Sequence, residues 1–187
     1  MPVPPPMLDL ALLALVGVAA ATDLASRRIP NRLLLAGAAL AFALRLGAPD
    51  PAAAVLWGVA GAATGLLLFL PLYCLRGMAA GDVKLLAAVG AFASPLAVAH
   101  IALATVCAGG LMALAVVIAR GRLRALLVNV GCLLRPWLMR LAGMPAQAEP
   151  MPAPSVGNIP YGVAIALGTA LVVGRGWLAS GTLPLLL

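Results

Sequence analysis

Long uninterrupted apolar runs are the feature that most limits what this chain can fold into. Runs of Ala, Leu and Val recur along most of the sequence, 64% of which is hydrophobic and only 9% charged, about a third of the charged share of a typical soluble protein. Too few polar side chains remain to cover a water-exposed surface. Lipid accepts such a chain, because helices satisfy their own backbone hydrogen bonds and ~20 apolar residues cross the hydrocarbon. The sequence therefore predicts an all-α, polytopic membrane protein.

Apolar runs and helix-breaking residues divide the chain into six predicted membrane helices. They are expected at about residues 7–25, 33–46, 53–75, 83–99, 101–119 and 161–178. The second and fourth are short for a full crossing. Residues 120–141 mix Arg with Leu, Val and Trp137, as an interfacial helix does. We interpret residues 1–187 as one domain, in which residues 120–157 form a cytoplasmic interfacial segment followed by a Pro-rich loop.

The distribution of basic residues predicts the orientation in the membrane. Ten of the twelve Lys and Arg residues fall in the loops and helix ends that follow the first, third and fifth predicted helices, and only Arg45 and Arg175 fall on the other side. Basic residues are retained in the cytoplasm, so we expect the N-terminus outside. The chain has a net charge of +7. Because its basic residues lie at the ends of apolar segments rather than on one soluble basic face, we expect no nucleic-acid partner.

Two of the five acidic residues share one level of the membrane. Asp23 ends the first predicted helix and Asp82 begins the fourth, so both reach the cytoplasmic boundary. Structural explanations exist, since Asp82 could cap its helix and Asp23 could pair with Arg27 one turn on. A cap does not explain Asp23, because the C-terminal end of a helix disfavours negative charge. Acids within membrane segments are candidate functional residues by default.

The residues around both acids resemble a known family. Asp23 followed by Arg28-Ile29-Pro30-Asn31, and the string Gly81-Asp82-Val83-Lys84, resemble the two signatures of type IV prepilin peptidases. The segment from Ile159 to Ala166, which contains Pro160-Tyr161-Gly162, is similar to the C-terminal segment of that family. Three matches in the family order, all predicted on one membrane face, extend the resemblance over most of the chain.

This resemblance implies an aspartyl endopeptidase of the bacterial inner membrane. Asp23 and Asp82 correspond to the catalytic pair, which cuts the leader from prepilin-like membrane proteins at the cytoplasmic boundary. Two close carboxyl groups share a proton, so one activates water while the other donates. We expect neither a metal nor another cofactor, and the bilayer and a prepilin-like substrate as partners. The sequence gives no indication of an oligomeric state.

Two departures from the family pattern are visible. The second family signature is G-x-G-D, whereas this chain has Ala79-Ala80-Gly81-Asp82, so Ala replaces the first Gly. Larger family members carry a cysteine-bearing cytoplasmic segment after the first helix and also methylate the mature pilin. Here that loop spans only about residues 26–32. The chain therefore resembles the short, peptidase-only branch associated with tight-adherence or Flp-type pili.

The candidate supporting residues are Ile29, Pro30, Asn31, Gly81, Lys84, Pro160, Tyr161 and Gly162. Pro30 is expected to end the first helix, and Asn31 to cap the second. Gly81 would let a substrate backbone approach Asp82. Lys84 is interpreted as a positive-inside anchor or as a contact to the substrate or to Asp82. Pro160-Tyr161-Gly162 is either a non-helical strip that binds extended substrate or an ordinary Pro helix start with an interfacial Tyr.

Two other classes of function stay open on the residues alone. A small transporter or proton-relay subunit would use the two aspartates to carry ions, and a secretion-complex scaffold would have no catalysis. A transporter predicts further polar residues deep in the helices, where this sequence has little beyond Thr64, Thr105 and Thr169. That scarcity favours a site at the membrane face.

Overall fold

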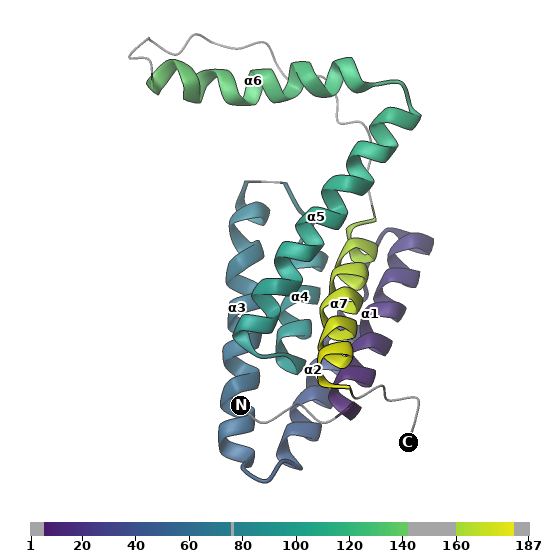
Figure 1. The fold of residues 1–187 in the computed structure, drawn as a ribbon, viewed down its shortest axis with the longest axis vertical. Helices are drawn as coiled ribbons and strands as arrows, with labels where there is room; N and C mark the ends of the chain where they lie inside the picture. Colours follow the sequence, from purple (N-terminus) through teal and green to yellow (C-terminus); the bar gives the residue numbers. More distant parts are fainter. Residues whose placement is uncertain (1–5, 76, 142–159, 182–187) are drawn as a thin grey trace. The chain divides into compact units, whose positions relative to one another are not determined.

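The computed structural model describes residues 6–75, 77–141 and 160–181, and its helices confirm the all-α prediction. They are α1 (Pro6–Ser26), α2 (Asn31–Leu46), α3 (Pro51–Cys74), α4 (Ala80–Phe92), α5 (Pro95–Ala119), α6 (Leu123–Leu141) and α7 (Tyr161–Ser180) (Figure 1). The predicted cytoplasmic residue Arg76, and Ile159 with the predicted loop that precedes it, lie outside the described residues.

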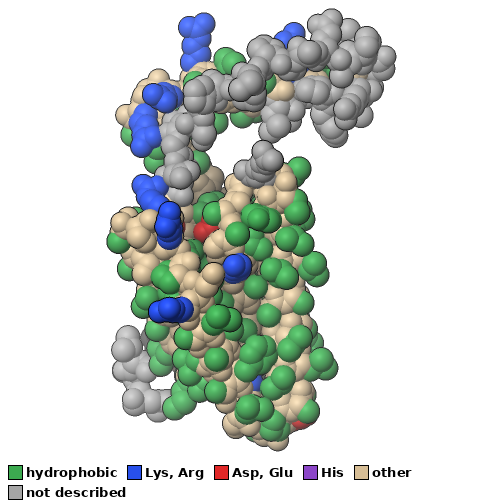
Figure 2. All heavy atoms as spheres, turned by 180° about the vertical axis from the view of Figure 1, so that it is seen from behind, with side chains coloured by type: hydrophobic (Ala, Val, Ile, Leu, Met, Phe, Trp, Pro, Cys, Tyr) green, Lys and Arg blue, Asp and Glu red, His purple; other side chains and the backbone are tan. Residues whose placement is uncertain are grey.

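Four of these helices are long and apolar enough to cross a membrane, namely α1, α3, α5 and α7. Their exposed side chains are what lipid requires: Leu56 on α3 is 70% exposed and Leu103 on α5 is 64% exposed. Figure 2 shows hydrophobic side chains over much of the visible face of the helical bundle. The helices are those of a membrane protein.

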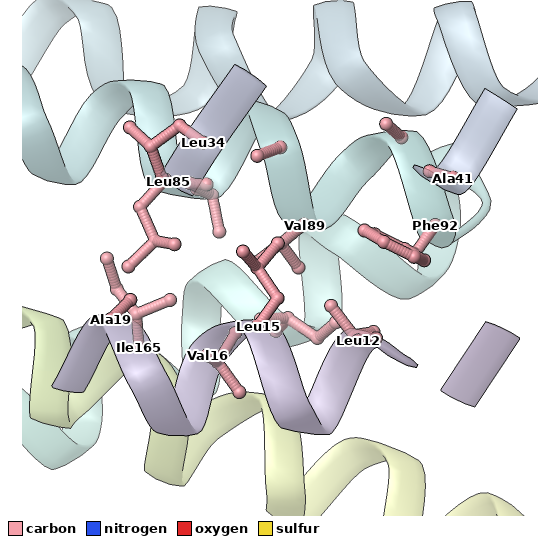
Figure 3. Packing of buried hydrophobic residues seen from close by; sticks show 14 of the residues in the cluster. Leu12, Leu15, Val16, Ala19, Leu34, Ala41, Leu85, Val89, Phe92 and Ile165 are labelled. Atoms are coloured by element: carbon pink, nitrogen blue, oxygen red, sulfur yellow. The ribbon is translucent and has the colours of Figure 1, made fainter. Parts of the chain in front are cut away.

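The described residues form two compact units, one within 1–109 and 160–187 and the other within 110–159. In the first unit, α4 contacts α1, α2, α3 and α7. Nine of its thirteen residues are buried, and Figure 3 shows side chains of α1, α2, α4 and α7 meeting in one apolar cluster. The helix that begins beside Asp82 is therefore the centre of this bundle.

Glycines allow the backbones of α3 and α4 to approach closely. A Cβ added at Gly61 of α3 would overlap the carbonyl oxygen of Gly90 in α4, and one added at Gly65 would overlap the carbonyl oxygen of Leu86. Small residues at helix contacts are the usual means of association in lipid, where burial from water supplies no driving force. These contacts fix α4 against a long apolar helix.

The boundary between the fourth and fifth helices was predicted wrongly. The prediction ended the fourth helix at Ala99, whereas α4 ends at Phe92 and α5 begins at Pro95. Ser94 accepts a hydrogen bond from the Ala97 backbone N–H through its hydroxyl, at 3.3 Å. A Ser cap followed by Pro in the first helical position is a strong start signal. The surrounding continuous apolar run masks this start signal in the sequence.

Arg45 is buried, although the sequence indicated only a basic residue at the outer side. Its Nε donates to the Ala91 carbonyl at 2.8 Å, and its Nη2 donates to the carbonyls of Phe92 at 2.9 Å and Ala93 at 3.3 Å. Its Nη1 donates to the Ala54 carbonyl at 2.9 Å. The guanidinium therefore caps the C-terminus of α4, where carbonyls lack helical partners and positive charge is favoured.

Candidate active site

Asp23 lies in the last turns of α1 and is buried, with 7% of its surface exposed. Its Oδ2 accepts a hydrogen bond of 2.8 Å from the backbone N–H of Gly162, the second residue of α7. The N-terminus of α7, with its unpaired N–H groups, thus meets a carboxyl that the C-terminal end of α1 disfavours. This contact supplies the reason for an acid at this position.

The close approach of α7 to Asp23 depends on glycine at position 162. A Cβ added there would lie 3.0 Å from Oδ2 and 3.1 Å from Cβ of Asp23. A methyl group would have to displace the carboxyl or the start of α7. Gly162 therefore positions Asp23.

Asp82 is the third residue of α4 and is also 7% exposed. Its position precedes the apolar part of that helix. Burial and the nearby charge of Asp23 raise its pKa to about 6, while a backbone hydrogen bond from Ala79 acts in the opposite direction. Two buried carboxyl groups from α1 and α4 thus interact, as a proton-sharing pair requires. Asp82 is not the N-cap residue of α4, which is Ala79; it accepts a backbone hydrogen bond from Ala79 from inside the helix.

Tyr161 lies between several helices at the same site. It is partly buried, lies near enough to Asp82 for an electrostatic interaction, and packs edge-on against Phe69 of α3 with ring centroids 6.2 Å apart. A Cβ added at Gly109 of α5 would lie 2.6 Å from its ring. Phe69 and Gly109, which support this ring, carried no sequence signal, because each lies within an ordinary apolar run.

The segment Pro160-Tyr161-Gly162 is not the non-helical strip that was one of the two predictions. Pro160 is the N-cap residue of α7 and Tyr161 begins the helix. The backbone N–H of Gly162 donates its hydrogen bond to Asp23 and not to an extended substrate. A helix start after Pro, the other prediction, is therefore observed, with Tyr161 at the site.

The two predicted signatures meet through Asn31 and Lys84. Asn31 is the first residue of α2, and Pro30 occupies the N-cap position, so the prediction that Asn31 caps this helix was wrong. Its Oδ1 instead accepts a hydrogen bond of 3.3 Å from Lys84 Nζ. Both side chains are exposed. Lys84 therefore joins the start of α4 to the start of α2.

Ile29 and Gly81 are neighbours at the start of α4. A Cβ added at Gly81 would meet only the Ile29 side chain, at 3.7 Å or more, which is ordinary van der Waals contact. Packing therefore does not require glycine there, and close approach of a substrate stays a prediction. Ala79 has φ −79° and ψ 149°, a conformation open to any residue. Ala in place of the family Gly is thus not strained.

Figure 2 shows Lys and Arg side chains toward one end of the helical bundle, with a small acidic patch among them. At the other end of α1, Asp9 Oδ2 accepts a hydrogen bond of 2.8 Å from Trp177 Nε1, which joins α1 to α7. Among the described residues, no three His, Cys, Asp or Glu side chains gather as a metal site would require.

A sequence model of the Type IV leader peptidase family matches residues 10–114, more than half of the 187 residues. The chain belongs to this family. The family match includes the positions of Asp23 and Asp82 and ends before the segment that begins α7. No curated protein and no solved structure matches the chain. Membership of the type IV leader peptidase family assigns a general peptidase function and confirms the resemblance found in the signatures.

Proposed function

We propose that this chain is an aspartyl endopeptidase of the bacterial inner membrane that removes the leader from prepilin-like precursors. The observation that carries the proposal is the pair Asp23 and Asp82. Both carboxyl groups are buried, they come from different helices, and they interact electrostatically. The family match supports a leader peptidase in general, and the pair supplies the chemistry.

In the proposed reaction Asp23 is the general base and Asp82 the general acid. A water oxygen attacks the scissile carbonyl carbon while Asp23 takes its proton and Asp82 protonates the carbonyl oxygen. The tetrahedral diol then collapses: the leaving nitrogen receives the proton from Asp23, the C–N bond breaks, and Asp82 recovers a proton from the diol. The raised pKa of Asp82 increases its protonated fraction near neutral pH, which supports its role as the proton donor of the pair. This mechanism uses no metal and no cofactor.

The proposed substrate is a prepilin-like membrane protein whose own apolar helix enters from the bilayer. Of the supporting residues, Tyr161, which interacts electrostatically with Asp82, is proposed to contact the substrate. The segment between α1 and α2 is only residues 27–30, which supports a short, peptidase-only member that performs no methyl transfer.

The proposed topology has six crossings, with the N-terminus outside and both aspartates at the cytoplasmic boundary. In it α2, and the part of α4 that follows Asp82, complete the crossings inside the bundle. Cysteine replacements at Arg28 and Ala48, in a background without native cysteines, test this by labelling from each side of the membrane. We expect position 28 to label only from the cytoplasm and position 48 only from outside. Labelling of both from the same side would contradict the topology.

Cleavage on co-expression with a pilin-like precursor tests the function. Asp23→Asn and Asp82→Asn should each abolish the shift in substrate size while the protein stays in the membrane, since an amide cannot exchange the shared proton. Asp50→Asn is the matched control: Asp50 caps α3 by accepting from the Ala53 N–H at 3.1 Å, and Asn preserves that bond. Processing that persists in both aspartate variants would refute the mechanism, and a wild type that cleaves no such precursor would refute the function.

A further inference from the structure

Helix α6 differs in composition from the membrane helices. It has nineteen residues, long enough to cross a membrane, yet it is not among the four helices apolar enough to do so, and Arg124, Asn129, Arg135 and Arg140 interrupt its apolar residues. A helix of that length with both apolar and charged positions is typical of the membrane interface rather than of a crossing.

The apolar side chains of α6 form an exposed stripe. Leu123, Leu127 and Val130 follow one another at spacings of four and three residues, which keeps them on one face of a helix. They are 45%, 64% and 42% exposed. Arg124, Val128 and Gly131, also exposed, lie on the face adjoining this stripe. An arginine beside an apolar stripe can lay its aliphatic stem along an apolar layer and keep its guanidinium at the charged boundary of that layer.

The charge of this segment has one sign. Residues 120–141 contain Arg120, Arg122, Arg124, Arg135 and Arg140, and no Asp or Glu. Such a segment complements a negatively charged surface. Phospholipid bilayers with anionic headgroups offer negative charge directly above an apolar layer.

Chain connectivity keeps α6 at the end of a membrane helix. The apolar helix α5 ends at Ala119, and only three residues separate it from Leu123, so the ends of the two helices are about 14 Å apart at most. Gly121 has φ +64°, the Arg122 N–H donates to the Val117 carbonyl at 3.0 Å, and the Gly121 N–H donates to the Ile118 carbonyl at 2.9 Å. This Schellman cap ends α5 decisively, so α6 is a separate helix that starts where a membrane crossing ends.

We propose that α6 binds the anionic surface of the surrounding bilayer, with Leu123, Leu127 and Val130 among the acyl chains and the arginines at the phosphate groups. The partner is lipid of net negative charge. This surface is distinct from the aspartate pair and holds α6 on the membrane.

The full-length protein, reconstituted in vesicles, allows a direct test. Single cysteines are introduced at Leu123, Leu127 and Val130, and at the adjoining face at Arg124, Val128 and Gly131, in a background without Cys74, Cys107 and Cys132. Each carries a nitroxide spin label, whose accessibility to oxygen and to a water-soluble nickel complex is measured. We expect several-fold higher oxygen-to-nickel ratios on the stripe than on the adjoining face in vesicles of phosphatidylcholine with phosphatidylglycerol.

Two further measurements make the result decisive. Replacing Arg122 and Arg124 by Gln should reduce the ratio on the stripe toward its value in vesicles of phosphatidylcholine alone, whereas Arg175→Gln in α7 should not. Equal accessibility on both faces in anionic vesicles would overturn the proposal. Low accessibility of the stripe to both reagents, together with dipolar broadening between labels, would also overturn the proposal, because that result places the stripe against a second copy of the chain. An equally high oxygen-to-nickel ratio on the stripe in vesicles with and without anionic lipid would refute the role of the arginines.

Discussion

The backbone N–H of Gly162 donates a 2.8 Å hydrogen bond to Oδ2 of Asp23, across 139 positions of sequence. The bond joins the last turns of α1 to the first turn of α7. It holds one carboxyl of the proposed catalytic pair, and a Cβ at residue 162 would lie only 3.0 Å from that carboxyl.

Replacing Gly162 by Ala should therefore reduce leader cleavage without preventing membrane insertion. The added Cβ would press on the Asp23 carboxyl, and small misplacement of a catalytic group costs on the order of 10- to 100-fold in rate. Initial rates on purified protein provide the measurement. Gly174→Ala is the matched control on the same helix, because nothing lies within 4 Å of a Cβ there. Equal rates for the two variants would show that the contact does not position Asp23.

Asp82→Asn should raise thermal stability at about pH 7.5 while abolishing cleavage. The folded-state pKa of Asp82 is about 6, above its ordinary 3.8, so its contribution to stability is present at low pH and lost as pH rises through about 6. An amide carries no charge and escapes that loss. Melting temperatures of wild type and variant should converge toward about pH 4. A gap between them that is independent of pH would contradict a buried, charged Asp82.

Asn31→Ala and Lys84→Ala should have effects on cleavage that do not add. Each variant removes the same 3.3 Å hydrogen bond between the starts of α2 and α4. Because both groups are exposed, we expect a loss of about 1 kcal/mol or less in stability. A double-mutant cycle on kcat/KM measures the coupling. Fully additive losses would mean that Lys84 acts independently of Asn31, as a direct substrate contact would.

Arg45→Ala should destabilise the protein by about 2–4 kcal/mol, because it leaves buried carbonyls at the end of α4 without donors. Arg45→Lys should recover only part of this loss, since an ammonium lacks the planar fork that reaches carbonyls of both α3 and α4. Thermal unfolding in one detergent compares them. Arg175→Ala serves as the control for loss of a basic residue, and an equal effect of the two Ala variants would contradict the capping role.

The sequence predicted those features of the fold and the site that depend on local residue patterns. Apolar runs gave the helices, and the signatures around Asp23 and Asp82 gave the family. It did not predict what depends on packing between distant segments. Arg45 counted only as a charge, since its carbonyl partners in α4 lie far away in sequence. The need for glycine at 162 follows from the Asp23 side chain on another helix. Asn31 is a typical N-cap residue in the sequence, and its actual partner, Lys84, lies on a helix distant in sequence.

The shortness of α4 has a consequence for how the protein is made. Thirteen residues rise about 20 Å, less than the ~30 Å hydrocarbon layer, and the first turns carry Asp82 and Lys84. Such a segment does not partition stably into lipid by itself. In the proposed six-crossing topology, α4 enters the bilayer together with α3, against which Gly61 and Gly90 hold it. In that topology, biogenesis couples the insertion of α4 to its assembly with α3.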